Sequence, residues 1–388
     1  MLAHSPPLPL VIDYTSRHRI TTEDEKGVIL ALRQHDRVRR IRLGMPLIDL
    51  QKLIAAMDGE YPILEYLIIM PPPEDKSTIL MLPERLQAPR LRHLTLENLA
   101  LPIESRLLTT SVGLVTLFLP MNDPFAYFHP NSLLHWLSFM PQLEMLAIFS
   151  FPNREMERQL MHIPITTSVT LPNLHHFKFS GISTELEAFV HRITTPRLER
   201  LGIVFFDRLM FSVPRLVQFI NTTKNLRFNG AKFAFNSKGV LVDVYPGAEA
   251  EMYALSMRVL YRHLDWQVSI VAQFFNSLIP MFSAVEHLAL EHEVHSQSSE
   301  EHNAVDRSEW RKLLRPFRNV KTLHIGNGLV GQLSRCLESK DGELPLELPE
   351  LLELTYSGDG NTGDAFIPFI NARRNAGRPV ALVLDQDL

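Results

Sequence analysis

Residues 89–96 read PRLRHLTL, with leucines at the third, sixth and eighth positions and mostly polar residues between them. The same phrase, with apolar residues in the order Leu-x-x-Leu-x-Leu, recurs in eight further segments. These segments are 62–69, 113–119, 141–148, 172–179, 196–203, 283–290, 318–325 and 349–356. Successive side chains of a strand point to opposite faces, so each segment predicts a short strand with one buried and one exposed face.

The spacing of these segments indicates a repeat. The first apolar positions of the first six, Leu64, Leu91, Leu114, Leu143, Leu174 and Leu198, are 27, 23, 29, 31 and 24 residues apart. Leucine-rich repeats have a period of about 20–29 residues with one strand in each unit. We therefore expect an α/β leucine-rich-repeat solenoid, with a curved parallel sheet inside and helices outside. In this interpretation residues 1–388 are a single domain, in which 1–37 hold an N-terminal strand and helix, an incomplete cap, and 38–388 hold the repeats.

Amphipathic stretches between the strands predict the helices. They are 22–34, 46–57, 131–140, 184–193, 265–278, 308–314 and 364–374. The repeat weakens between residues 225 and 262. There Lys232–Asn236 and Gly239–Tyr245 predict two strands joined by a tight turn, and Ala254–Leu260 predicts a third. We therefore expect an irregular, hairpin-like insertion in the sheet.

The composition excludes several classes of protein. Lys and Arg number 39 against 43 Asp and Glu, whereas a general nucleic-acid-binding protein carries a basic excess. The single cysteine, Cys336, excludes an intrachain disulfide framework, and its spacing from neighbouring leucines predicts a buried core thiol. No signal peptide opens the chain, and no apolar run has the length of a membrane span. We expect a cytoplasmic or nuclear monomer that binds neither nucleic acid nor membrane.

Two motifs suggest enzymatic or metal chemistry and are better explained otherwise. Gly326–Gly331 (GNGLVG) matches the dinucleotide fingerprint GxGxxG, but Gly358–Gly363 (GDGNTG) matches it again after the next strand. The duplication favours a repeat feature, with glycines supplying a positive φ where each strand turns outward. His292 and His295 lack the spacing of a zinc protease motif, so solvated or partner-facing histidines are favoured over a metal site. We therefore expect no catalytic residue, no cofactor and no metal.

The residues between the leucines form rows across the concave face of the predicted sheet. Aromatic, Met and Arg residues are enriched in the cores of protein interfaces, and several occur in these rows. We expect the concave face to bind a protein through Arg42, Tyr66, Ile68, His93, Thr95, Phe118, Met145, Phe149, His176, Lys178 and Arg200. The alternative is that loops or insertions cover part of this face.

The segment 263–274 (HLDWQVSIVAQF), together with Trp310, Pro316-Phe317 and the opening Pro7–Tyr14 (PLPLVIDY), resembles a large family of fungal F-box/leucine-rich-repeat proteins. In that family an F-box docks on the adaptor of a cullin–RING ubiquitin ligase, and the repeats recruit the substrate. The nearest F-box-like string here, Leu82–Leu86 (LPERL), runs straight into a repeat strand, so the F-box is missing from this chain.

The resemblance implies a non-enzymatic substrate-recognition module, which would meet a ubiquitin-ligase adaptor only if an F-box lies upstream. The alternative is a stand-alone leucine-rich-repeat scaffold with no ubiquitin role. A dinucleotide-binding enzyme that uses Gly326–Gly331 is the outside alternative.

Overall fold

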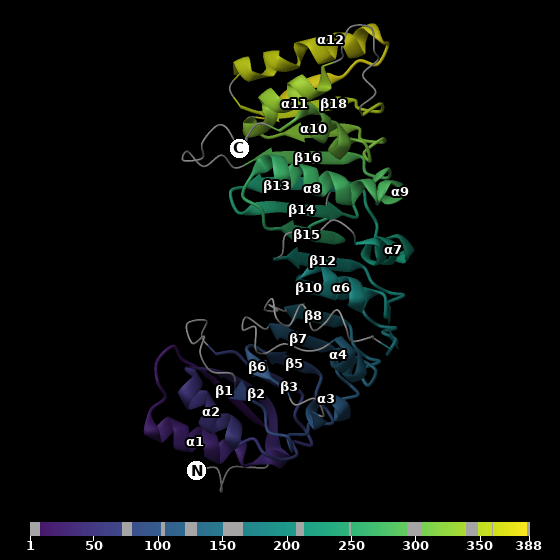
Figure 1. Cartoon of the computed structure of the whole chain (residues 1–388). Coiled ribbons are helices and arrows are strands. Elements are labelled where there is room, and N and C mark those ends of the chain that lie inside the picture. Colours follow the sequence, from purple (N-terminus) through teal and green to yellow (C-terminus); the bar gives the residue numbers. More distant parts are fainter. Residues whose placement is uncertain are drawn as a thin grey trace. The chain divides into compact units, whose positions relative to one another are not determined.

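The computed structural model describes residues 8–71, 80–101, 105–120, 130–149, 166–206, 213–247, 250–292, 305–338, 348–358 and 360–385. The chain forms two compact units, Met1–Leu198 (unit 1) and Glu199–Leu388 (unit 2). Each is an α/β unit built on a large, mostly parallel sheet (Figure 1). The expected single domain over 1–388 stays a prediction beside this division. Among the described residues, no helix combines the length and the apolarity that crossing a membrane requires.

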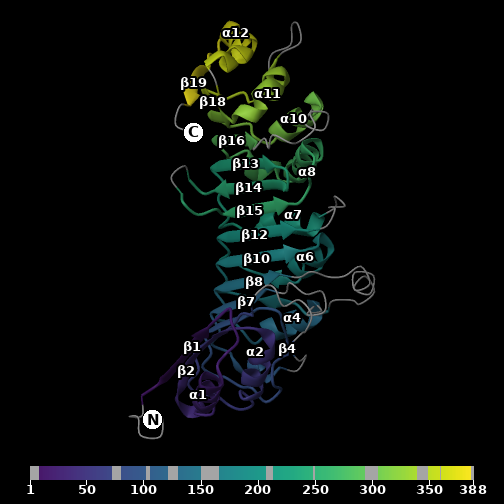
Figure 2. The same cartoon turned by 90° about the vertical axis from the view of Figure 1, so that its left-hand side faces the viewer.

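Unit 1 arranges its main strands in the order in which the chain makes them. They are β1 (Leu10–Thr15), β2 (Val38–Gly44), β3 (Tyr66–Ile69), β5 (His93–Leu96), β7 (Thr116–Pro120), β8 (Met145–Phe149) and β10 (His176–Gly181), each parallel to the next. The helices between or after them are α1 (Thr22–Leu32), α2 (Leu47–Ala55), α3 (Arg106–Thr110), α4 (Pro130–Leu137) and α6 (Ser183–Val190). Two small sheets pair β4 (Leu80–Met81) with β6 (Leu99–Ala100), and β9 (Val169–Thr170) with β11 (Ile193–Thr194). Figure 2 shows α4 and α6 on one side of the strands.

The repeated phrase of unit 1 folds as a turn followed by a strand. The apolar residues of segment 89–96, Leu91, Leu94 and Leu96, are fully buried, and their counterparts in 62–69 and 113–119 are buried as well. The first leucine of each phrase closes a turn, as where the Leu91 N–H donates to Ala88 O at 3.0 Å. The strand itself is therefore shorter than the phrase and begins two residues after that leucine. Each such buried leucine stabilises the fold by about 1.5–3 kcal/mol.

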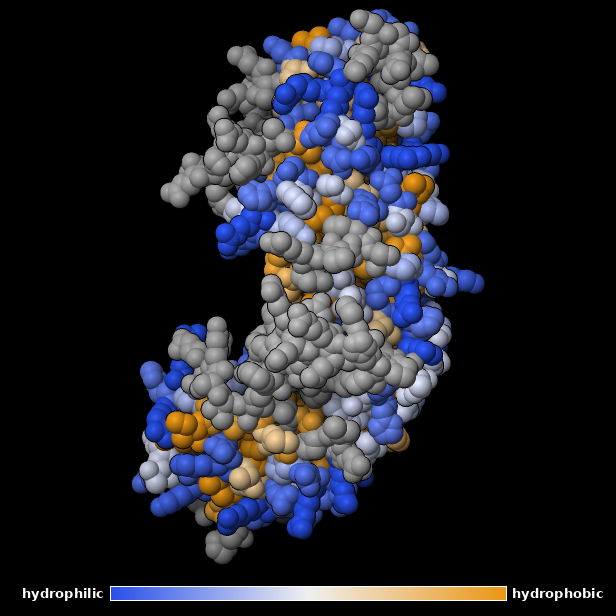
Figure 3. Space-filling model, in the orientation of Figure 1, coloured by the Kyte–Doolittle hydropathy of each residue, from blue (hydrophilic) through white to orange (hydrophobic). Residues whose placement is uncertain are grey.

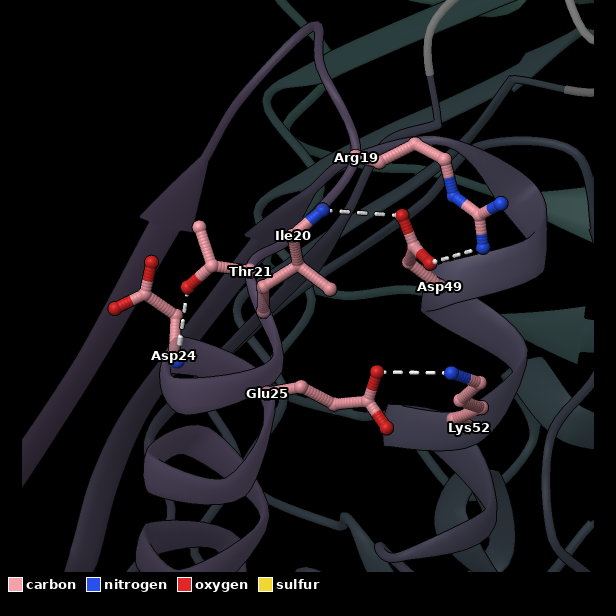
Figure 4. Close-up of polar contacts among 7 residues, drawn as sticks. All are labelled: Arg19, Ile20, Thr21, Asp24, Glu25, Asp49 and Lys52. Atoms are coloured by element: carbon pink, nitrogen blue, oxygen red, sulfur yellow. Dashed lines mark hydrogen bonds and ion pairs between the residues drawn. The ribbon is translucent and has the colours of Figure 1, made fainter.

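The first strand and helix are joined to the following repeat by a buried carboxylate (Figure 4). Asp49 on α2 is 1% exposed and accepts hydrogen bonds from the Ile20 N–H and the Arg19 guanidinium, both at 3.1 Å. Burial by itself would raise the pKa of Asp49, but the hydrogen bonds from Arg19 and Ile20 outweigh it and lower the pKa. Lys52 on α2 also pairs with Glu25 on α1 at 2.8 Å. A strand–helix pair therefore precedes residue 38, and β1 extends the parallel sheet by one strand.

Unit 2 departs from chain order at the predicted insertion. Its strands are β12 (Arg200–Phe205), β13 (Gly230–Asn236), β14 (Gly239–Tyr245), β15 (Leu255–Val259), β16 (His287–His292), β17 (Thr322–Ile325), β18 (Glu353–Ser357) and β19 (Ala381–Asp385). They lie in the order β12-β15-β14-β13-β16-β17-β18-β19. Strand β14 is antiparallel to both its neighbours, and the other pairs are parallel. The three predicted strands and their hairpin are confirmed, and β15 closes back onto β12.

A glycine sets the turn of this hairpin. The Asn236 side-chain oxygen accepts hydrogen bonds from the backbone N–H groups of Lys238 and Gly239, at 2.9 and 3.1 Å. Gly239 has a φ of 157°, and a Cβ there would lie 2.2 Å from Val259 O on β15. Only a residue without a side chain fits between β14 and β15 at this point.

The inserted strands pack against a core of aromatic side chains. The helices of unit 2 are α7 (Pro214–Thr222), α8 (Leu264–Asn276), α9 (Ile279–Phe282), α10 (Arg307–Leu314), α11 (Val330–Leu337) and α12 (Ile367–Asn375). Phe233 on β13 meets Phe275 on α8 and Phe317 edge-on, with ring centroids 5.4 and 5.8 Å apart. The buried Gln267 of α8 donates to Asn236 O and Tyr261 O, which joins the helix to the hairpin turn. The expected helix at 364–374 starts later, at Ile367, after a 3-10 turn over Gly360–Phe366.

Candidate partner-binding surface

The residues between the leucines lie in register across unit 1, as the phrase predicted. Paired strands place Arg42, Ile68, Thr95, Phe118, Ala147 and Lys178 side by side in one row. The adjacent row holds Arg40, Tyr66, His93, Thr116, Met145 and His176. We call the sheet face that carries these rows the outer face, because the leucines point to the opposite, buried side. It is the face that the sequence analysis expects to be concave.

One cluster on the outer face centres on Tyr66. The Tyr66 and His93 rings are stacked, with centroids 4.4 Å apart and planes 9° from parallel. The Arg40 guanidinium lies over the Tyr66 ring at 5.7 Å, and His93 Nδ1 lies 3.2 Å from Thr116 Oγ1. Burial lowers the pKa of His93, and the neighbouring Arg92 adds to the shift. A neutral imidazole is therefore favoured in the stack at neutral pH.

A second cluster centres on Phe118. Its ring meets the Phe149 ring edge-on at 5.3 Å, and Lys178 Nζ lies over the Phe149 ring at 5.3 Å. Phe118, Phe149 and Lys178 are each half-buried. The side chains on three adjacent strands therefore support one another and leave part of each ring in contact with solvent. We call the two clusters together, Arg40, Tyr66, His93, Phe118, Phe149 and Lys178, the Tyr66–Phe118 surface.

The remaining predicted residues differ in their setting. Met145 is 37% exposed, whereas Ala147, two residues further along β8 and in the other row, is buried. Arg42 lies 4.0 Å from Asp13 on β1, and Ile68, Thr95 and His176 are half-buried. Arg200 is half-buried on β12 and belongs to unit 2. Leu30 on α1 and Ile48 on α2 are more exposed than Met145, and so is Val11 on β1, which pairs with Arg40 and extends the row of Tyr66. Apolar residues also gather in the lower part of the view in Figure 3.

The two glycine motifs of unit 2 have structural roles, although the reason for the first differs from the one expected. Gly326 does not have a positive φ. A Cβ there would lie 3.2 Å from Glu291 Cα and 3.4 Å from Leu290 O, so this glycine allows close approach to β16. Gly358 does have a positive φ, of 150°, as expected. A Cβ at Gly363 would overlap the ring of Tyr356.

The remaining candidates from the sequence are two histidines and the single cysteine. No group of His, Cys, Asp and Glu able to hold a metal ion occurs in the described part of the chain. His292 ends β16, and its proposed companion His295 lies outside the described residues. Cys336 is fully buried on α11 with Sγ 3.8 Å from Arg307 O, which confirms the prediction of a core thiol.

A groove in unit 2 was not predicted. It has a volume of about 630 Å³ and lies on the outer face of β13, β16, β17 and β18, beside the segment after β14. Its lining includes Lys232, Tyr245, Glu251, His287, His324 and Glu353. A signal was present in the sequence, because Gly230 and Ala289 interrupt the rows of larger outward side chains.

Comparison with known proteins identifies no family for this chain. No protein-family model and no curated protein matches the chain. Among solved structures, the leucine-rich repeat-containing protein LegL7 from Legionella pneumophila aligns over 95% of this chain and 98% of that chain, with 11% identity and a TM-score of 0.31. A likeness at this identity and TM-score assigns neither a function nor a binding site to this chain.

Proposed function

We propose that the chain is a leucine-rich-repeat solenoid that binds a protein partner through the Tyr66–Phe118 surface, as a non-enzymatic monomer of the cytoplasm or nucleus. The observation that carries this proposal is the set of contacts on the outer face. There two aromatic clusters, each with a cation over a ring, occupy adjacent strands of a parallel sheet. Repeat proteins commonly use their extended sheet face for binding, and interface cores are enriched in Tyr, Phe, Met and Arg.

The contacts also indicate how a partner would gain affinity. The rings are held in place by neighbours before binding, so ordering them costs little conformational entropy. A partner that covers Tyr66 or Phe118 buries the exposed part of a rigid ring, which is the typical setting of an interface hot spot. Removing one such ring is expected to cost about 2 kcal/mol of binding free energy, or roughly 30-fold in affinity.

The test compares partner binding of two matched variants of unit 1. Partners cross-linked to the chain in cells are identified by mass spectrometry and then measured with purified protein. Phe118→Asp places a charge in the surface, and Val112→Asp places the same charge at a residue that is 54% exposed in a turn outside the two rows. We expect Phe118→Asp to reduce affinity at least tenfold and Val112→Asp to leave it unchanged, with circular dichroism unaltered in both. Equal affinity of the two variants for every purified partner would contradict the proposal.

We further propose that the bound partner is a substrate of an F-box-type ubiquitin ligase. The support is the resemblance of segment 263–274 and of Pro7–Tyr14 to fungal F-box/leucine-rich-repeat proteins. Sequencing the transcript upstream of the Met1 codon, followed by co-purification with the ligase adaptor, tests this assignment. A transcript without an F-box, or one whose product does not bind the adaptor, would favour the stand-alone scaffold.

A nicotinamide-dependent enzyme is the competing class, through the glycines at 326–331. The close approach of Gly326 to β16 supports a packing role instead. A ligand that binds the native state raises its apparent stability, so thermal unfolding with NAD and NADP separates the classes. We expect no change in the melting temperature, and a rise that depends on cofactor concentration would favour the enzyme.

A further inference from the structure

The groove in unit 2 arises from small residues at outward positions. Gly230 on β13 lies opposite His287 on β16, and Ala289 on β16 lies between Lys232 and His324 in the adjacent row. A glycine and an alanine contribute almost no side-chain volume, whereas Lys232, His287 and His324 stand beside them. The two small residues therefore form the bottom of the groove, and the three longer side chains form its sides. Its volume of about 630 Å³ falls within the range of about 300–1,000 Å³ that is typical of ligand sites.

The lining has an acidic balance. Among its described residues Lys232 is the only permanent cation, and it is already paired with Glu291 at 2.8 Å. Glu251 and Glu353 contribute two carboxylates to the lining, and Glu353 accepts a hydrogen bond from the Thr355 hydroxyl at 3.3 Å. Further acids stand close to the lining: Asp243 lies opposite Lys232 on β14, and Asp385 lies 3.7 Å from His324.

The remaining polar groups of the lining are of the kind that orient a bound chain. His287 Nδ1 lies 2.8 Å from Thr322 Oγ1, and His324 Nε2 lies 3.5 Å from Ser357 Oγ. Burial raises the pKa of Tyr245, and Asp243 adds to the shift, so the phenol keeps its proton. These groups supply hydrogen-bond donors and acceptors for a polar ligand.

We propose that this groove binds a basic, extended peptide segment of a partner protein, with lysine or arginine side chains paired to Glu251 and Glu353. The charge complementarity and the elongated floor across four strands carry the assignment. The groove belongs to unit 2 alone, so the inference does not depend on binding by the Tyr66–Phe118 surface in unit 1.

The experiment measures binding of a fluorescein-labelled tetra-arginine peptide to the full chain by fluorescence anisotropy at low ionic strength. A tetra-glutamate peptide and the small polycation spermine are compared at the same concentrations. The double variant Glu251→Gln with Glu353→Gln removes the two carboxylates, and Glu84→Gln with Glu60→Gln removes two exposed acids from unit 1 as a control of equal net charge. Ala289→Phe fills the floor without changing any charge.

We expect the tetra-arginine peptide to bind and the tetra-glutamate peptide not to bind. The double variant in the groove should weaken binding about tenfold or more, because charge-assisted hydrogen bonds are lost, whereas the unit 1 control should change it less than twofold. Ala289→Phe should weaken binding to a similar extent while the circular dichroism spectrum is retained. Equal loss in the two double variants would show general attraction to an acidic protein and overturn the proposal. Undiminished binding to Ala289→Phe, or spermine binding as tight as the peptide, would overturn it as well.

Discussion

The outer faces of the two units share the repeated phrase, apart from the inserted strands of unit 2, and they present different surfaces. In unit 1 the positions between the leucines hold Tyr66, whose ring stacks on His93, and Phe118, whose ring meets that of Phe149. In unit 2 the equivalent rows contain Gly230 and Ala289, and a groove of about 630 Å³ opens between larger neighbours. The leucines determine that a sheet forms, and the residues between them determine what that sheet presents to a partner.

The units also differ in how the chain passes through the sheet. Unit 1 adds one parallel strand after another, while unit 2 inserts a hairpin and returns β15 to the side of β12. The groove lies on the inserted strand β13 and the strands that follow it. The inserted hairpin therefore makes the surface of unit 2 unlike that of unit 1.

Gly239→Ala should have the largest effect, because it removes the feature that distinguishes unit 2. A Cβ at this position would lie 2.2 Å from Val259 O, so β14 and β15 would have to separate. We expect a loss of about 3 kcal/mol or more in the free energy of unfolding, measured with urea. Gly247→Ala, where a Cβ meets nothing within 4 Å, is the matched control and should change stability by less than about 0.5 kcal/mol. Similar values for both would mean that the hairpin does not depend on Gly239.

Asp49→Ala tests the buried carboxylate that joins the first strand and helix of unit 1 to the following repeat. It leaves the Ile20 N–H without its carboxylate acceptor, which is expected to cost about 1–3 kcal/mol. Because the folded-state pKa of Asp49 is lowered, its contribution is present above the unfolded value of about 3.9 and is lost as the pH falls through the folded value. The difference in urea unfolding between wild type and variant should therefore stay constant from pH 7 down to about pH 5 and shrink as the pH falls below about 4. Asp36→Asn, at an exposed position, should run parallel to wild type at every pH.

Tyr66→Ala, compared with Leu94→Ala, should show that the two faces of the unit 1 sheet contribute differently to the free energy of unfolding. The outward Tyr66 loses its stack on His93, worth about 0.5–1.5 kcal/mol, while the inward Leu94→Ala opens the core at a cost of about 2–5 kcal/mol. Thermal or urea unfolding of the two variants gives both numbers. An equal cost would mean that Tyr66 acts as a core residue rather than as part of a binding surface.

Gly331→Ala and Gly326→Ala should give small changes of opposite sign. Gly331 lies in α11, and a Cβ added to it would have no neighbour within 4 Å, so alanine should stabilise unit 2 by about 0.5–1 kcal/mol. Gly326→Ala should destabilise it by about 1 kcal/mol, because β16 must move by a few tenths of an ångström. Differential scanning calorimetry measures both. Two shifts of the same sign would contradict the packing roles given to these glycines.

Much of the fold could be predicted because it depends on local pattern. The phrase at 89–96 placed β5, and counting between leucines placed Arg42, Ile68, Thr95 and Phe118 in one row, which the strand pairing confirms. The turn at Asn236–Gly239 was visible as a hairpin signal for the same reason. Whether the Tyr66–Phe118 surface binds a partner stays a prediction.

Other features depend on contacts between distant segments. Nothing in the sequence near Ala254 says that β15 returns to β12, and the close approach of Gly326 to Glu291 requires two strands brought together by a crossover. The groove likewise needs Gly230, Ala289 and Glu251 to meet from β13, β16 and the segment after β14.

The pattern of apolar residues along the chain predicts which residues of the repeated phrase are buried, where its strands lie and which residues share a row, because these features follow from the two-residue period of a strand. The order of β12 to β16, the hydrogen bonds to the buried Asp49 carboxylate and the groove in unit 2 depend instead on the tertiary structure. The physical reason is that strand order, close backbone approach and cavity shape depend on which distant segments pack together, and the local pattern of apolar residues is compatible with several such arrangements.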